Sequence, residues 1–118
     1  MITAQHIAVM SKDPILFAVS NPNPEVLPEV ALASGAAVVA TGRSDFPNQL
    51  NNLMVFPGLF RAILELRAKE ISDDLKLAVA YRLAETVSDP RRDMIVPSCV
   101  EKSTHYAVYE EVKKFFGN

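Results

Sequence analysis

Two short apolar runs, each too short for a helix, constrain the fold of this chain most strongly. The first covers residues 15–19 (Ile-Leu-Phe-Ala-Val) and the second covers residues 37–40 (Ala-Val-Val-Ala), and a polar loop follows each of them. Uninterrupted apolar runs of this length are typical of strands buried on both faces of a parallel sheet. A helix predicted over residues 28–34, ended by Gly35, would supply the right-handed crossover between them. The sequence therefore predicts an α/β fold with parallel strands.

The rest of the chain is predicted to be mainly helical. Apolar spacing and capping residues predict further helices over residues 3–10, 53–67, 72–87 and 102–116. Before residue 28, we expect Asn23 to be an N-cap and Pro24 to begin a short helical turn. A third short strand is expected over residues 94–96. The helix over 53–67 is expected to bury one side, formed by Leu59, Phe60, Ile63, Leu64 and Leu66.

Two or three strands with four or five helices are few for a complete doubly wound sheet, which usually has about five or six strands. The 118 residues, 49% of them hydrophobic, suit one packed domain. We therefore expect residues 1–118 to form one partial Rossmann-like domain, the last part of something larger. Both edges of a two-stranded sheet are open, so self-association through an edge is expected.

Composition excludes several classes of function. A net charge of −2 gives no basic surface for nucleic acid, and no apolar run approaches the roughly 20 residues that cross a bilayer. Residues 1–6 lack the basic start of a signal peptide. Cys99 is the only cysteine, which fits a reducing compartment. We therefore expect a cytoplasmic protein that binds neither nucleic acid nor membrane.

Asparagine residues gather in the two polar loops that follow the predicted strands. Asn21 lies in the first loop, and Asn51 and Asn52 end the second loop, which covers residues 41–52. In an open α/β sheet, ligands bind outside the carboxyl ends of the strands. A carboxamide offers two donors and an acceptor without charge, so it can hold a small polar substrate. The alternative is that these residues only favour turns, by bonding to their own backbone.

Four charged residues have a functional and a structural interpretation. Arg43 and Asp45 could grip a carboxylate and act as a base or metal ligand, or they could form an ion pair within the loop. Asp73 and Asp74 suit the first turn of a helix capped by Ser72 better than a metal site.

Neither a phosphate-binding loop nor a zinc site is predicted. No pair of glycines fits G-x-G-x-x-G; the glycines are Gly35, Gly42, Gly58 and Gly117. His6 and His105 lack further ligands at zinc-binding spacing. Cys99 has no positioned histidine beside it in the sequence, so we expect a small buried residue rather than a nucleophile.

Three blocks of the sequence resemble the malic enzymes, especially the short prokaryotic type. They cover residues 17–25 (FAVSNPNPE), 40–52 (ATGRSDFPNQLNN) and 56–61 (FPGLFR). The similarity extends over roughly residues 10–87 and weakens beyond Pro97, where Ser-Cys-Val-Glu replaces the family's usual Ser-Pro-Phe-Asp. The resemblance implies oxidative decarboxylation of malate to pyruvate and CO2, with reduction of NAD or NADP and use of Mg²⁺ or Mn²⁺.

The resemblance also implies roles for individual residues. Asn21 would contact malate and the nicotinamide ribose, and Asn52 would hydrogen-bond the malate carboxylate. Asn51 would lie against the nicotinamide, and Ser20 would line the cofactor cleft. No catalytic residue or metal ligand is expected here, because the family's catalytic Tyr and Lys, its acidic metal ligands and its glycine-rich loop lie upstream of the matched stretch. The tyrosines on predicted helices are not promoted to fill that gap; they are Tyr81, Tyr106 and Tyr109.

Residues 1–118 are therefore expected to be the C-terminal portion of the NAD(P)-binding domain of a malic enzyme, inactive in isolation and without tight binding of NAD, NADP or metal. The alternative function is a non-catalytic interaction or dimerisation module, which pairs its open sheet edge with a partner or a second copy. A further alternative is a weak binder of small acids. In the first two cases we expect a homo-oligomer or self-association.

Overall fold

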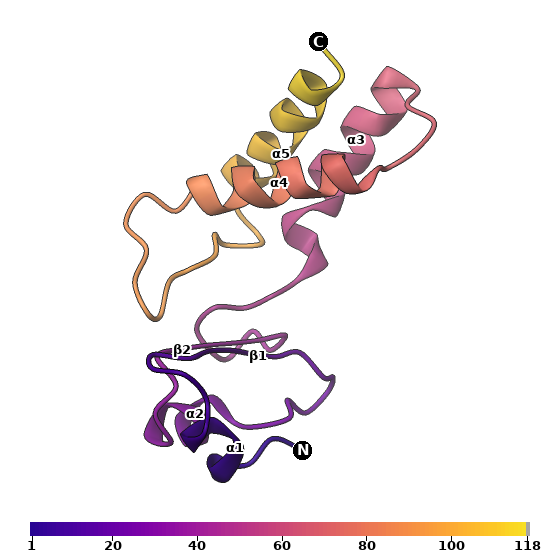
Figure 1. The fold of residues 1–118 in the computed structure, drawn as a ribbon. Helices are drawn as coiled ribbons and strands as arrows, with labels where there is room; N and C mark the ends of the chain where they lie inside the picture. Colours follow the sequence, from indigo (N-terminus) through magenta and orange to yellow (C-terminus); the bar gives the residue numbers. More distant parts are fainter. Residues whose placement is uncertain (118) are drawn as a thin grey trace. The chain divides into compact units, whose positions relative to one another are not determined.

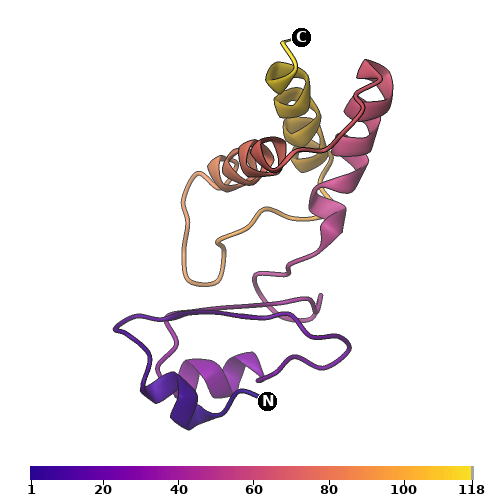
Figure 2. The same cartoon turned by 45° about the vertical axis from the view of Figure 1, so that its right-hand side comes forward.

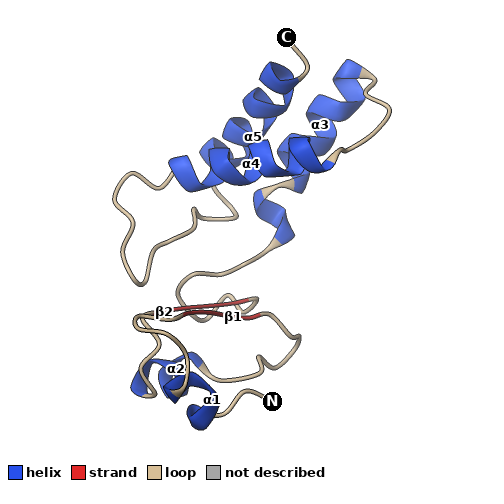
Figure 3. Ribbon diagram, in the orientation of Figure 1, coloured by secondary structure: helices blue, strands red, loops and turns tan. Residues whose placement is uncertain are grey.

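Residues 1–117 are described by the computed structural model, and they divide into two units (Figure 1). Unit 1 comprises Met1–Leu50 and Pro90–Ile95. Unit 2 comprises Asn51–Asp89 and the C-terminal stretch that begins at Val96. Both strands belong to unit 1, and the three longest helices belong to unit 2 (Figure 3).

A pair of parallel strands forms the centre of unit 1. Strand β1 (Ile15–Ala18) pairs with β2 (Val38–Thr41), and helix α2 (Pro28–Ala33) connects them. Helices α1 (Ala4–Ala8) and α2 lie on the same face of the strands (Figure 2). The core on that face is made of Ile7, Leu16, Ala18, Val26, Ala31, Ala36 and Val39. The predicted α/β class, a partial Rossmann-like fold, is confirmed: of the two or three strands and four or five helices expected, the described residues form two parallel strands and five α-helices.

The opposite face of β1 is exposed in unit 1. Burial alternates along the strand, with Leu16 and Ala18 buried while Ile15 is 62% and Phe17 is 51% exposed. The prediction that residues 15–19 are buried on both faces is therefore wrong within the described residues. The reason is that both short helices pack on one side of the sheet. The apolar run over residues 15–19 therefore leaves one apolar face of β1 exposed, because no described residue of unit 1 covers it.

The outer edge of β2 is partly occupied, so the expectation of two open edges is also wrong. The Leu50 amide donates to the Thr41 carbonyl at 2.7 Å, and Thr41 forms an isolated parallel bridge with Gln49. The third strand predicted over 94–96 is absent, because the backbone at Met94 folds back onto Arg91. That tight turn leaves no extended segment to join the sheet.

The loop after β1 does not form the helical turn that Asn23 and Pro24 were expected to begin. Helix α2 begins at Pro28, with Leu27 as its N-cap residue, while residues 24–27 are irregular. Pro28 fits the first helical position, where a missing N–H costs nothing. Gly35 follows the helix with a φ of +105°, a conformation that glycine adopts without strain. The prediction that Gly35 ends this helix is therefore confirmed.

Three helices build unit 2. They are α3 (Phe56–Leu66), α4 (Asp73–Glu85) and α5 (Lys102–Phe115), and a 3₁₀ helix, η1 (Asn52–Met54), precedes α3. Helix α5 packs against both α3 and α4 (Figure 1). Their shared core consists of Leu59, Ala62, Leu75, Val79, Val108 and Val112. Within residues 1–117, every helix is too short or too polar to span a bilayer.

Two details of unit 2 follow from single residues. Ser72 accepts the Leu75 amide at 3.2 Å, which confirms the predicted cap of α4. Gly58 allows α3 and α5 to cross closely, because a Cβ there would lie 2.2 Å from the His105 carbonyl oxygen. This contact turns the face of α3 that contains Gly58 towards α5. Consequently the predicted buried side of α3 is partly wrong: Phe60 is exposed, and Leu64 is 76% exposed.

Candidate functional site

The carboxyl ends of β1 and β2 bring Asn21 and Gly42 together. Ala18 and Thr41 are paired at the carboxyl ends of the strands. Asn21 follows Ala18, and Gly42 follows Thr41, within a few residues. A Cβ built on Gly42 would lie 3.0 Å from the Asn21 Oδ1 atom and 3.6 Å from its Nδ2 atom. The Asn21 carboxamide thus lies directly against the loop that follows β2. Unit 1 therefore brings the loop that contains Asn21 against the start of the loop after β2, at the sheet edge where ligands bind in open α/β folds.

Ser20 is held by the glutamate at the end of its own loop. Its hydroxyl donates to the Glu25 Oε1 atom at 2.7 Å, and its amide donates to Oε2 at 3.2 Å. Hydrogen bonding from the Ser20 hydroxyl holds the pKa of Glu25 below its usual value. The peptide bond between Asn21 and Pro22 in this loop is cis. Closure of the loop on Glu25 gives Asn21 a defined backbone position.

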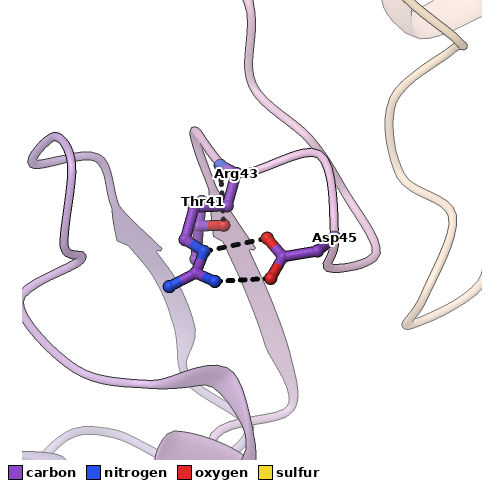
Figure 4. A network of polar contacts seen from close by, with 3 residues as sticks. All are labelled: Thr41, Arg43 and Asp45. Carbon is purple, nitrogen blue, oxygen red and sulfur yellow. Dashed lines mark hydrogen bonds and ion pairs between the residues drawn. The ribbon is translucent and has the colours of Figure 1, made fainter.

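Arg43 and Asp45 form a two-pronged ion pair in the loop after β2 (Figure 4). The Nε and Nη2 groups of Arg43 donate to the two carboxylate oxygens of Asp45, at 2.8 and 2.5 Å. The Arg43 amide also donates to the Thr41 hydroxyl at 3.2 Å, and its guanidinium lies 5.0 Å from the centre of the Phe46 ring. The guanidinium lowers the pKa of Asp45, chiefly by hydrogen bonding. Of the two interpretations, the structure shows the ion pair.

Asn48 is a buried residue that sequence reasoning missed. It is 6% exposed, and its φ of +56° lies in the left-handed region that asparagine tolerates better than most residues. Its Nδ2 group donates to the carbonyls of Val39 and Arg92, at 3.1 and 2.8 Å, and its Oδ1 atom accepts the Ile95 amide at 2.8 Å. Two of these partners are 44 and 47 residues away in the sequence, so no local pattern could reveal them.

Asn51 and Asn52 belong to unit 2, whereas Ser20 and Asn21 belong to unit 1. The Asn51 Oδ1 atom accepts the Leu53 amide at 2.9 Å and so caps η1. This is the turn-forming role that was the structural alternative for the asparagines. The cap does not use the Asn51 Nδ2 group. Asn52 is the first residue of η1 and is exposed.

The histidines and the cysteine have structural partners. His6 accepts the Thr3 amide and completes the capping box of α1, and His105 Nε2 lies 2.9 Å from the Cys99 carbonyl oxygen. Cys99 is buried, as predicted.

In the part of the chain that the structure describes, no three side chains of His, Cys, Asp or Glu come close enough to hold a metal ion. The residues present therefore do not fit a Mg²⁺ or Mn²⁺ site by themselves.

Known proteins are similar to this chain over most of its length. The family described as "Malic enzyme, NAD binding domain" matches residues 2–109. The bifunctional malic/malolactic enzyme of Bacillus subtilis (strain 168) is 45% identical over 115 residues, which are 96% of this chain and 28% of that protein. The NADP-dependent malic enzyme of Halomonas elongata is 42% identical over 91 residues, which are 76% of this chain and 22% of that protein.

A solved structure gives the same result. The crystal structure of an NAD-dependent malic enzyme from Thermotoga maritima superposes with a TM-score of 0.89 at 39% identity, covering 95% of this chain and 29% of that one. This chain thus spans less than a third of the length of these relatives. The resemblance inferred from three sequence blocks is confirmed, and the chain belongs to the family of malic enzyme NAD-binding domains.

Proposed function

We propose that this chain forms the malate- and nicotinamide-facing portion of the NAD(P)-binding domain of a malic enzyme. The reaction would be the oxidative decarboxylation of malate to pyruvate and CO2, with reduction of NAD or NADP. The observation that carries the proposal is the position of the Asn21 carboxamide, held against Gly42 at the carboxyl ends of both parallel strands. Membership of the family and the cofactors named for its relatives support it.

Neutral amides suit this task for a physical reason. Asn21 can donate to a carboxylate or hydroxyl and accept from a hydroxyl or an amide, without acting as a base. We assign it to malate and the nicotinamide ribose, Asn52 to the malate carboxylate, and the free side of Asn51 to the nicotinamide. Ser20 would line the cofactor cleft, because its oxygen keeps lone pairs while its proton bonds to Glu25. These residues bind and orient; they transfer no proton.

The cofactor supplies the chemistry that these side chains lack. When bound, NAD or NADP would supply the hydride acceptor that the oxidation of malate requires. The metal of the family would be held by residues other than those of the described chain. Accordingly, we predict that the isolated 118-residue chain has no malate-dependent NAD(P)H formation. Steady formation of NAD(P)H by the pure chain would contradict this prediction.

Ligand binding by the isolated chain tests the assignment of Asn21. The chain is titrated separately with malate, NAD⁺ and NADP⁺ while the side-chain amide resonances of its asparagines are followed by NMR. We expect the Asn21 resonances to shift, and the Asn21→Ala variant to lose affinity. Asn23→Ala is the matched control, because Asn23 is exposed in the same loop but has no assigned role. Equal losses in both variants, or no shift at Asn21, would contradict the proposal.

A second candidate function is association through β1. No strand among residues 1–117 pairs with the outer edge of β1, and the exposed side chains of Ile15 and Phe17 lie on the same strand. Such a strand is a template for pairing with another chain. Sedimentation should then show a mass that rises with concentration and falls in Phe17→Lys. A monomeric mass at every concentration would exclude this candidate.

A further inference from the structure

Asn48 uses its whole carboxamide inside unit 1. Both Nδ2 hydrogens and one Oδ1 lone pair are engaged, by the Val39 carbonyl, the Arg92 carbonyl and the Ile95 amide. Among the described residues, no buried side-chain nitrogen or oxygen lacks a partner. A buried network in which every group is satisfied specifies one arrangement, whereas a network missing one member leaves costly unpaired groups.

The three bonds join three separate stretches of chain. Val39 lies in β2, Asn48 lies in the loop that follows β2, and Arg92 and Ile95 lie in the segment 90–95. On the outer edge of β2, the Asn48 side chain thereby hydrogen-bonds the Val39 carbonyl, as the backbone of a neighbouring strand would. It also ties the segment 90–95, which belongs to unit 1 although it is distant in sequence, to that edge.

These stretches are also the points where the chain passes between the units. It leaves unit 1 after Leu50, two residues beyond Asn48, and it leaves again after Ile95, whose amide Asn48 accepts. The first residues of unit 2 are Asn51 and Asn52. Asn51, the first residue of unit 2, is therefore only three residues from the anchored side chain of Asn48. Backbone motion at Asn48 would displace the backbone of Asn51 and Asn52 as well.

We propose that Asn48 is a positioning residue: its three hydrogen bonds anchor both ends of unit 1, near Leu50 and Ile95, and so fix the backbone that leads into Asn51 and Asn52. The inference rests on the proposed function for the ligand, but the anchoring itself can be measured without one. Asn48 is a residue that touches no substrate and acts through the backbone on either side of it.

Two variants separate the hydrogen bonds from the backbone conformation. Asn48→Asp is nearly isosteric and keeps the acceptor for the Ile95 amide, but it removes both donors. Asn48→Gly keeps the left-handed φ and removes all three bonds. Val26→Ala is the control, because it weakens the buried core of the same unit without touching this network. Unfolding by denaturant ranks the three variants by stability.

NMR of the 118-residue chain gives the readout that lost stability alone would not change. In both Asn48 variants we expect the side-chain amide resonances of Asn51 to move, and in Asn48→Gly we expect exchange of the Ile95 amide to accelerate about 5- to 150-fold. Val26→Ala should leave the Asn51 resonances in place. Unchanged Asn51 resonances in the Asn48 variants, or the same change in Val26→Ala, would overturn the inference.

Affinity for malate, NAD⁺ and NADP⁺ completes the test. If the unaltered chain binds any of them, the Asn48 variants should bind more weakly than Val26→Ala at matched stability, and equal binding would overturn the positioning role. If the unaltered chain binds none, the proposed function fails in this chain. The Asn51 and Ile95 signals would then still decide whether Asn48 anchors both ends of unit 1.

Discussion

Replacing Gly42 by alanine tests whether the Asn21 carboxamide must lie where the structure has it. The added Cβ would lie 3.0 Å from the Asn21 Oδ1 atom and 3.7 Å from its Cγ atom. The shorter distance is tighter than ordinary van der Waals contact, so the Asn21 side chain has to move by a few tenths of an ångström. Since Asn21 is exposed, it can move outwards without disturbing the core.

The effect on stability and the effect on binding should therefore diverge. The φ of Gly42 is not in the left-handed region, so alanine fits its backbone, and such replacements stabilise by about 0.4–1 kcal/mol through the unfolded chain. The displaced carboxamide loses one well-placed hydrogen bond to a ligand, about 0.5–1.5 kcal/mol. We expect a free energy of unfolding within about 1 kcal/mol of the unaltered chain, and an affinity for malate or NAD(P) that is about 2- to 13-fold lower.

A double-mutant cycle gives the decisive assay. Binding is measured by calorimetry for Gly42→Ala, for Asn21→Ala and for the double variant. If Gly42 acts only by making room for Asn21, the double variant should lose no more affinity than Asn21→Ala alone. Losses that add, or an unchanged side-chain resonance of Asn21 in Gly42→Ala, would refute the reasoning.

Three further substitutions test the rest of the structure. Gly58→Ala should lower the free energy of unfolding by about 1–3 kcal/mol, because its Cβ would overlap the His105 carbonyl; denaturant unfolding measures this. Arg43→Gln should raise the pKa of Asp45 towards its ordinary value in an NMR titration, because the hydrogen bonds from Arg43 now depress it. Since the folded pKa is depressed, the pair stabilises the fold above the ordinary pKa of aspartate and loses that effect as pH falls through the folded pKa. Ser72→Ala should cost about 1 kcal/mol in thermal unfolding, because it removes the cap of α4.

Each of these predictions has a control within the chain. Ser103→Ala removes an exposed hydroxyl on α5 and should leave stability nearly unchanged, unlike Gly58→Ala and Ser72→Ala. The pKa of Asp73, which Lys76 lowers, should stay low in Arg43→Gln. If Gly58→Ala or Ser72→Ala unfolds with the same free energy as Ser103→Ala, the argument for that residue is contradicted. If the pKa of Asp45 is unchanged in Arg43→Gln, the argument for the ion pair is contradicted.

Local signals in the sequence predicted most of the fold correctly. The two apolar runs became β1 and β2, the helix between them connects parallel strands, and the caps at Ser72 and Gly35 are where the residue types predicted them. Two of the errors, the predicted burial of both faces of β1 and the predicted buried side of α3, have one cause in common. Whether an apolar side chain is buried depends on which face other elements cover, and the sequence of β1 or α3 does not contain that information.

The site was predictable only in part, for a similar reason. Asn21 and the loop after β2 are joined because parallel strands end at the same edge, and this rule needs only the strand positions. The ion pair of Arg43 and Asp45 spans two residues and was foreseeable as one of two alternatives. Asn48 was not, because Arg92 and Ile95 come to it through the tertiary fold.

Burial, rather than residue type, separates the roles of the asparagines in this chain. Asn48 is buried with its carboxamide fully engaged, so its replacement must change the structure around it. The Oδ1 atom of Asn51 accepts the Leu53 amide in the cap of η1. Asn21 and Asn52 have exposed side chains. A residue can present its amide to a ligand only if something else fixes its position. In the function proposed above, Asn48 would supply such support for the backbone that leads to Asn51 and Asn52, and Gly42 would leave room for the Asn21 carboxamide.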